Sequence, residues 1–156
     1  MSAWTKALPY FPEHELACSH CGVVKLDRRF AAALPGLRLE ADRALSPSSV
    51  CRCPEHNVAV RGHVRSMHLT EQPQSEIDLG RGRRAGAMGA DFLWGHWTDQ
   101  ERRDFAILAR RRGWAVGLNT AFAHVDWRIA IGLEPTTFEY GGWVATWGRA
   151  TVEAAV

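Results

Sequence analysis

The sequence predicts a single domain of the α+β class, because its helical and strand-like segments are segregated along the chain and do not alternate regularly. Its 156 residues are 46% hydrophobic, which is enough to form one full core. No internal repeat and no long linker rich in Pro, Gly or Ser divides residues 1–156. We therefore expect all the elements below to belong to one unit.

The first helix is expected to begin after Asp27, which can cap it, and to run towards Arg43. Apolar residues recur there at helical spacing: Phe30, Leu34, Leu37, Ala41 and Leu45. Pro35 and Gly36 interrupt this pattern, which predicts a kink or two short helices.

The middle of the chain is expected to contain two short strands. The first is SSVCR at 48–52, and the second is EIDLG at 76–80. The segment GRGRRAGAMGAD, at 80–91, is rich in glycine and arginine, and we expect it to be a flexible loop.

The clearest helix is expected to start at Thr98, where TDQE is a capping box that pairs Thr98 with Glu101. Gly113 provides its stop signal. The apolar runs at 114–118 and 122–128 are separated by two polar residues, which predicts an antiparallel strand pair.

Charge and hydropathy exclude several classes of function. Nineteen basic residues against seventeen acidic ones give a net charge of +2, so the strongly basic surface typical of nucleic-acid binding is not indicated. No apolar run approaches the roughly 20 residues that a membrane span requires. The N-terminal segment also lacks the apolar stretch of a signal peptide. We expect no nucleic-acid partner, no membrane insertion and no export signal.

The four cysteines fall into two clusters, Cys18 with Cys21 and Cys51 with Cys53. A domain of this size does not need disulfides for stability. Three interpretations remain open: a structural zinc site formed by all four, one or two disulfides, and free thiols. A nucleophilic role for Cys53, with His56 or His124 as its base, is a fourth alternative.

Two histidines and an aspartate form a candidate zinc set: His68 in SMH, Asp78 in EIDLG and His124 in FAHVDWR. Two imidazoles and one carboxylate leave a coordination position for water or substrate, as in catalytic zinc sites. In the alternative interpretation, these are separate polar residues at strand ends and in loops.

Several motifs follow one another in a distinctive order. They are FPEHELACSHCG, SSVCRCPEHN, VRGHVRSMH, EIDLG and FAHVDWR, with a helix ending in ARRRGWAVGL before the last of them. In this order they resemble the zinc peptidases that include bacterial D-Ala-D-Ala carboxypeptidases and phage L-alanyl-D-glutamate endopeptidases. Their fold is shared with the hedgehog signalling domain. The resemblance spans about residues 11–128.

This resemblance implies a small antiparallel sheet that carries one catalytic zinc ion, with helices packed on one side. The ion would be bound by His68, Asp78 and His124. Arg52 would bind a substrate carbonyl or carboxylate and help to hold the oxyanion, and Ser66 would line the site.

Two features depart from the family pattern. The aspartate lies ten residues after His68, where the family usually has seven, so Glu71 or Glu76 is an alternative to Asp78. The insertion can also bulge outwards without moving either ligand.

The positions that carry the general base in the family are occupied here by Ala121 and Phe122. Asp126 shares a strand face with His124, and we expect it to act as the base or to orient His124. His96 is a further candidate for the base.

The expected function is that of a monomeric zinc metallopeptidase that hydrolyses the peptide stems of bacterial peptidoglycan, such as a phage endolysin. D,D-carboxypeptidase, D,D-endopeptidase and L,D-endopeptidase activities all fit this pattern. Such a protein would be made in the cytoplasm and act at the cell wall after release or as a virion component. The alternative is a non-catalytic virion or wall-binding protein that retains the fold.

Overall fold

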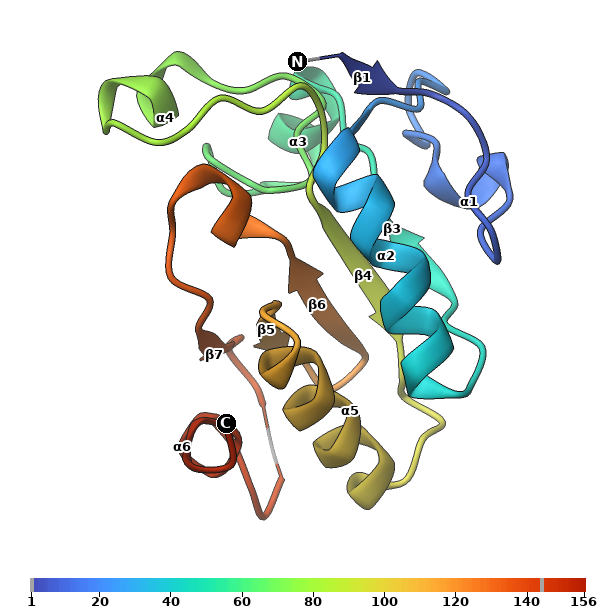
Figure 1. The fold of residues 1–156 in the computed structure, drawn as a ribbon, viewed down its shortest axis with the longest axis vertical. Coiled ribbons are helices and arrows are strands. Elements are labelled where there is room, and N and C mark those ends of the chain that lie inside the picture. Colours follow the sequence, from blue (N-terminus) through green and yellow to red (C-terminus); the bar gives the residue numbers. More distant parts are fainter. Residues whose placement is uncertain (1, 144) are drawn as a thin grey trace.

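A five-stranded sheet forms the centre of the computed structural model, which describes residues 2–143 and 145–156 (Figure 1). Its strands are, in spatial order, β3 (Pro47–Ser49), β4 (Gly89–Leu93), β6 (Phe122–Asp126), β5 (Ala115–Leu118) and β7 (Thr137–Glu139). All neighbours are antiparallel except β5 and β7, which pair in parallel. The α+β class is therefore confirmed, but the sheet is mixed and not purely antiparallel.

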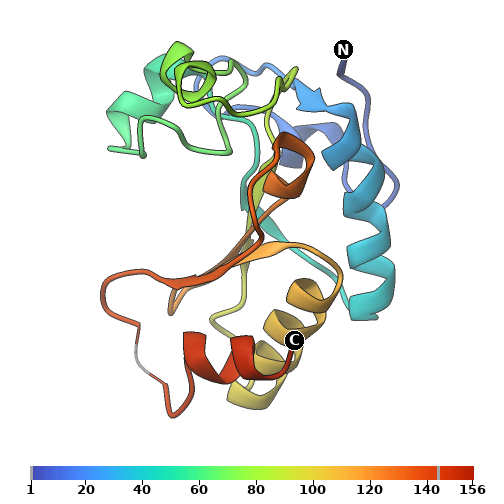
Figure 2. The ribbon, with the colours of Figure 1, turned by 60° about the vertical axis from the view of Figure 1, so that its left-hand side comes forward.

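The remaining elements surround this sheet. The helices are α1 (Glu13–Leu16), α2 (Arg28–Ala41), α3 (Pro54–Ala59), α4 (Gln74–Asp78), α5 (Asp99–Arg111), the 3-10 helix η1 (Arg128–Ile131) and α6 (Arg149–Ala154). Two further short strands, β1 (Ala3–Trp4) and β2 (Leu26–Asp27), pair with each other. The long helices α2 and α5 lie on the same face of the central sheet (Figure 2). None of the described helices is both long enough and apolar enough to span a bilayer.

Helix α2 begins where the sequence predicted, because the Asp27 side chain accepts a hydrogen bond from the Arg29 backbone N–H at 2.9 Å. The helix continues through Pro35 to Ala41, so of the two predicted alternatives, a kink or two short helices, the second is wrong. Its buried stripe, formed by Phe30, Ala31, Leu34 and Leu37, packs into the core. This packing outweighs the roughly 3 kcal/mol that an internal proline costs.

Helix α5 and the strands after it also confirm the sequence prediction. Thr98 and Glu101 form the complete capping box, and Gly113 follows the helix with a φ of +93°. Strands β5 and β6 then pair antiparallel. Along β6, Ala123 and Val125 face the core. The alternate side chains therefore face away from the core.

Two expectations for residues 76–91 are wrong. EIDLG is not a strand, because residues 74–78 form α4, in which the Glu76 side chain turns inward to buried Arg84 at 3.0 Å. The glycine-rich segment is not a loop throughout, because its last three residues begin β4. Met88 donates its N–H to the Met67 carbonyl at 2.7 Å, so the chain between them leaves the sheet region and returns to it.

We predict that Asp27→Asn destabilises the protein by about 1–3 kcal/mol at neutral pH, since it weakens several hydrogen bonds to a fully buried carboxylate. Burial favours the neutral form, but hydrogen bonds from Arg29 and from the Ala85 N–H outweigh it and lower the pKa of Asp27. A lowered native pKa stabilises the fold above the unfolded value of about 3.9, and this contribution disappears as the pH falls below it. Urea unfolding at pH 7 and pH 3 should show the difference from wild type shrinking in acid.

The control for this experiment is Asp104→Asn on the exposed side of α5, which should change stability by less than about 0.5 kcal/mol. An Asp27→Asn variant as stable as this control at pH 7 would contradict the role given to Asp27.

Candidate metal centre

One row of cross-strand neighbours runs through the whole central sheet. The strand registers align Ser49 with Asp91, Asp91 with His124, His124 with Gly117, and Gly117 with Phe138. Directly opposed residues on antiparallel strands have Cβ atoms about 4.5–5.5 Å apart, so their side chains meet. The pairing of β4 with β6 therefore brings a carboxylate and an imidazole together.

Two glycines leave room for these side chains. A Cβ on Gly89 would lie 3.2 Å from Cε1 of His124 and 3.1 Å from Cβ of Met67. A Cβ on Gly117 would lie only 2.6 Å from the Phe138 ring, which packs 5.7 Å from the His124 ring, centroid to centroid. The small residues beside His124 thus let an aromatic ring and the chain at Met67 approach it.

The second histidine, His68, comes from the segment that precedes the excursion between Met67 and Met88. Its backbone is held by the Arg52 N–H, which donates to the His68 carbonyl at 2.8 Å, and by the Ser66 hydroxyl, which accepts from the His68 N–H at 3.2 Å. The buried His68 ring consequently lies against the row of Asp91 and His124.

Three side-chain atoms converge at this point. Nε2 of His68 lies 3.1 Å from Oδ1 of Asp91 and 3.2 Å from Nδ1 of His124, and that Nδ1 lies 2.8 Å from the same Oδ1. Tetrahedral zinc with bonds of about 2.0–2.1 Å places its donor atoms about 3.3 Å apart. The triangle therefore has nearly the dimensions of a zinc site.

The outer nitrogens of both histidines are already hydrogen bonded. His68 Nδ1 lies 2.9 Å from the Val50 carbonyl, and His124 Nε2 lies 2.9 Å from Oδ2 of Asp126. Donation to these acceptors leaves the lone pairs of the inner nitrogens facing each other and the Asp91 oxygen. Such a cluster of acceptors requires a proton or a cation at its centre, so the donor set fits a metal ion.

The charges of the cluster agree with this interpretation. Burial disfavours the charged form of His124, but hydrogen bonds to Asp126 and Asp91 outweigh it and raise the pKa of His124 to about 9. Burial likewise opposes ionisation of Asp91, yet the two histidines hold its pKa well below the usual range. The site thus keeps an anionic carboxylate and attracts positive charge.

The sequence prediction of Asp78 as a ligand is corrected by this geometry. Asp78 lies at the end of α4, is exposed, and accepts a hydrogen bond from Gln74 at 2.9 Å. Its proposed alternatives also lie elsewhere, since Glu71 is exposed and Glu76 is paired with Arg84. The carboxylate that joins His68 and His124 is Asp91.

The sequence prediction does not include Asp91, because it treats the whole glycine-rich segment as a loop. One signal was present: in MGADFLW, a single carboxylate interrupts an otherwise apolar run of strand length. The spacing of the family that the sequence resembles predicts a carboxylate soon after His68. In this chain the excursion between Met67 and Met88 lies between His68 and the carboxylate that joins it.

The cluster borders a pocket of about 540 Å³. Arg52 and Ser66, both expected at the site, are among its lining residues. The Arg52 guanidinium is held by Asn57 Oδ1 and Ser49 Oγ, each at 3.1 Å, and its Nη2 lies 4.0 Å from Oδ2 of Asp91. Arg52 therefore sits beside the candidate metal position with its plane fixed.

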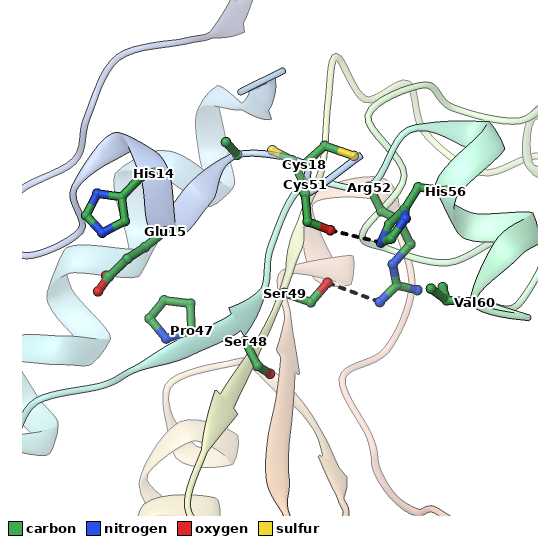
Figure 3. A pocket seen from close by; sticks show the side chains of 12 residues that line it. His14, Glu15, Cys18, Pro47, Ser48, Ser49, Cys51, Arg52, His56 and Val60 are labelled. Atoms are coloured by element: carbon green, nitrogen blue, oxygen red, sulfur yellow. Dashed lines mark hydrogen bonds between the residues drawn. The ribbon is translucent and has the colours of Figure 1, made fainter. Parts of the chain in front are cut away.

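A second pocket, of about 550 Å³, shares Arg52 and Val60 with the first (Figure 3). Ser49 and His56 also line it. Arg52 thus lines both pockets.

Asp126 lies behind His124, on the side away from Asp91. Its side chain is fully buried and accepts two hydrogen bonds from the Arg128 guanidinium, at 2.8 and 2.7 Å, and one from the Arg128 backbone N–H at 3.2 Å, besides the contact with His124. Burial favours its neutral form, but the bonds from Arg128 and His124 outweigh it and lower the pKa of Asp126 to about 2. So weak a base suits orientation of His124 better than removal of a proton.

The other positions considered for a general base do not supply one at the pocket. Phe122 lines the pocket, and Ala121 precedes it on the chain. His96 is exposed and is not among the lining residues. The carboxylates that line the described pocket are Asp91 and Asp126.

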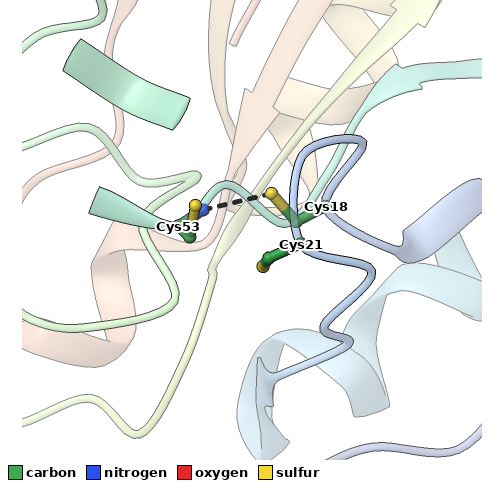
Figure 4. Close-up of side chains that lie close together, drawn as sticks. All are labelled: Cys18, Cys21 and Cys53. Carbon is green, nitrogen blue, oxygen red and sulfur yellow. Dashed lines mark hydrogen bonds between the residues drawn. The ribbon is translucent and has the colours of Figure 1, made fainter. Parts of the chain in front are cut away.

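Three of the four cysteines form a second cluster, in which the Sγ atoms of Cys18, Cys21 and Cys53 lie within 4.8 Å of one another (Figure 4). Cys51 is not part of it, because its buried Sγ lies 3.4 Å from the Lys25 N–H and 3.6 Å from the Lys25 carbonyl. The site of four cysteines considered from the sequence is therefore reduced to three.

Comparison with known proteins adds no assignment: no family model, no curated protein and no solved structure matches the chain.

We predict that His68→Ala, Asp91→Asn and His124→Ala each remove one bound zinc ion per chain relative to wild type, because each loses one of three converging donors. Asp78→Asn is the matched control and should bind zinc as wild type does. Metal content measured by mass spectrometry after dialysis checks this. Loss of zinc from Asp78→Asn together with retention in Asp91→Asn would mean that Asp78, and not Asp91, is the third ligand.

We also predict that Asp126→Asn weakens zinc binding by about 10- to 100-fold through His124, the range typical of an outer hydrogen-bond partner. Competition with a chelator measures this change. If Asp126 were instead the general base, zinc affinity would stay unchanged and the rate at full zinc occupancy would fall by about 10² to 10⁴.

Proposed function

We propose that this protein is a zinc-dependent peptidase that hydrolyses the peptide stems of bacterial peptidoglycan. The observation that carries the proposal is the convergence of His68 Nε2, Asp91 Oδ1 and His124 Nδ1 at the edge of an open pocket. Three protein donors with access to solvent are the arrangement of a catalytic zinc site, whereas structural sites are closed by a fourth donor. The substrate class rests on the order of the sequence motifs, which resembles that of zinc peptidases acting on bacterial cell-wall peptides.

The lining of the pocket supports an anionic substrate. Besides Arg52, it includes Arg61, Arg65, Arg81 and Arg128. Arg81 and Arg128 are paired with carboxylates, but Arg61 and Arg65 have no ion-pair partner among the described residues. Guanidinium groups bind carboxylates with two parallel hydrogen bonds, and peptidoglycan stems carry free carboxylates.

The zinc ion and the side chains of the pocket would have different roles in the reaction. A zinc ion held by the three donors would polarise the scissile carbonyl and lower the pKa of a bound water towards neutrality. Arg52 can donate to the oxygen that becomes negative, since Asn57 and Ser49 already fix its guanidinium. Burial raises the pKa of Tyr140, which also lines the pocket, so its hydroxyl keeps its proton and can donate as well.

One observation favours a second function, a non-catalytic wall-binding or virion protein. The two lining carboxylates are both engaged, Asp91 by the two histidines and Asp126 by His124 and Arg128. Among the described lining residues, therefore, no carboxylate is available to take a proton from water. In this function the pocket would bind a stem peptide without cleaving it.

Incubation of purified peptidoglycan and synthetic stem peptides with the protein tests both functions. We predict amide hydrolysis that a chelator abolishes, that added zinc restores and that His124→Ala lacks. Arg52→Ala should retain zinc and lower kcat/KM by about 10² to 10³, the range typical of one lost oxyanion donor. The control, Arg103→Ala in α5, changes a residue that does not line the pocket and should behave as wild type.

Mass spectrometry of the released fragments identifies the bond that is cut. Saturable binding of stem peptides by the zinc-loaded protein without any cleavage would reject the peptidase and support the binding function.

A further inference from the structure

We propose that Cys18, Cys21, Cys53 and His20 form a second metal site, a structural zinc centre that fastens the N-terminal loop to the segment that carries Arg52. This site is separate from the histidine and aspartate cluster, and the proposal does not depend on the proposed catalytic activity. Tetrahedral zinc with Zn–S bonds of about 2.3 Å requires sulfur atoms about 3.8 Å apart. The three Sγ atoms lie within 4.8 Å of one another, so only small side-chain movements bring them to that spacing.

The loop from Cys18 to Gly22 has the conformation of a zinc knuckle. Gly22 donates its N–H to the Cys18 carbonyl at 2.8 Å, and Cys18 donates its own to the Val23 carbonyl at 2.9 Å. Gly22 has a φ of +75°, which L side chains rarely adopt, and this lets the chain turn back directly after Cys21. Both cysteines of the CxxC pair therefore face the same point.

Backbone N–H groups are directed at the sulfurs. Cys53 donates its N–H to Cys18 Sγ at 3.4 Å (Figure 4), and His56 donates its N–H to Cys53 Sγ at 3.4 Å. Cys53 is the N-cap of α3, so its sulfur faces the first turn of a helix. Such donors stabilise the thiolate form, which is the form that binds zinc.

The fourth ligand is assigned to His20. Its Nδ1 lies 3.4 Å from Cys53 Sγ, but it is not part of the group of three sulfurs that lie within 4.8 Å of one another, so the ring would turn inward when the ion binds. The nearby His56 instead directs its Nε2 to the Ser19 hydroxyl at 3.3 Å. Three thiolates and one imidazole complete a closed tetrahedral set of the structural type. A disulfide would pair only two of the three thiols and give no role to His20.

The site has a defined position relative to the pocket. Cys53 directly follows Arg52, and Cys51, directly before it, donates its N–H to the Leu16 carbonyl at 3.1 Å. The ion would thus fix the chain on the Cys53 side of Arg52, while the bond from Cys51 to Leu16 holds the other side. Its role is to position Arg52 and stabilise the loop, not to take part in the reaction.

Metal analysis of the full-length protein, purified under reducing conditions, tests the proposal. Wild type should bind two zinc ions per chain, and Cys18→Ser, Cys21→Ser and Cys53→Ser should each bind one. Cys51→Ala is the matched control and should keep both. His20→Ala should weaken the second site about 10-fold or more, since even an outer partner is worth that much, while His56→Ala should leave it unchanged.

Cobalt substitution separates the two sites. His124→Ala loaded with cobalt should retain the near-ultraviolet thiolate-to-cobalt absorption, and the cysteine variants should lack it. If the variants do not fold, stepwise titration of wild type with a mercurial thiol reagent should release one zinc ion as three thiols react. Absence of thiolate-to-cobalt absorption in reduced wild type, or a disulfide among these cysteines in freshly purified protein, overturns the proposal.

Discussion

The direct pairing of Asp91 with His124 across β4 and β6 is the contact on which the rest of the site depends. Side chains alternate between the two faces of a strand, so a slip of one strand by one residue would turn its polar group towards the core and separate the pair. The register is fixed from the other face, where Ala90, Phe92, Ala123 and Val125 are fully buried. The hydrophobic core beneath α2 and α5 therefore determines which polar side chains meet on the pocket side.

A backbone hydrogen bond next to this pairing explains how the chain tolerates the long excursion between Met67 and Met88. The Met67 carbonyl and the Met88 N–H bond directly, so the two ends of the excursion meet at the edge of the site. Within it, Arg84 is fully buried, pairs with Glu76 and donates to the carbonyls of Leu69 and Ser66. A buried ion pair without these extra hydrogen bonds would not repay its desolvation. The excursion is thus held in place independently of the cluster of His68, Asp91 and His124.

The contacts behind the candidate ligands form a layer of their own. Val50 accepts from His68, Asp126 accepts from His124, and Arg128 holds Asp126. Ser49 at the end of β3 and Asn57 in α3 orient Arg52. This layer sets the tautomer of each imidazole and the direction of the guanidinium, so the donor atoms face one point before any ion binds. Directly after Arg52, the Cys53 N–H donates to Cys18 Sγ and so links this layer to the N-terminal loop.

The sequence by itself determined the α+β class, the capped starts of α2 and α5, the pair β5 and β6, and the two histidines of the site. These features depend on local signals: caps, periodicity and a polar residue on an apolar strand. The third member of the cluster was decided only by the tertiary structure. Asp91 and His68 are far apart in the sequence, and only strand register and the return of the chain at Met88 bring them together. Only the tertiary structure shows that Cys51 does not join the other three cysteines, because its sulfur is buried against the backbone of Lys25. The spacing of cysteines along the chain carries no information about that packing.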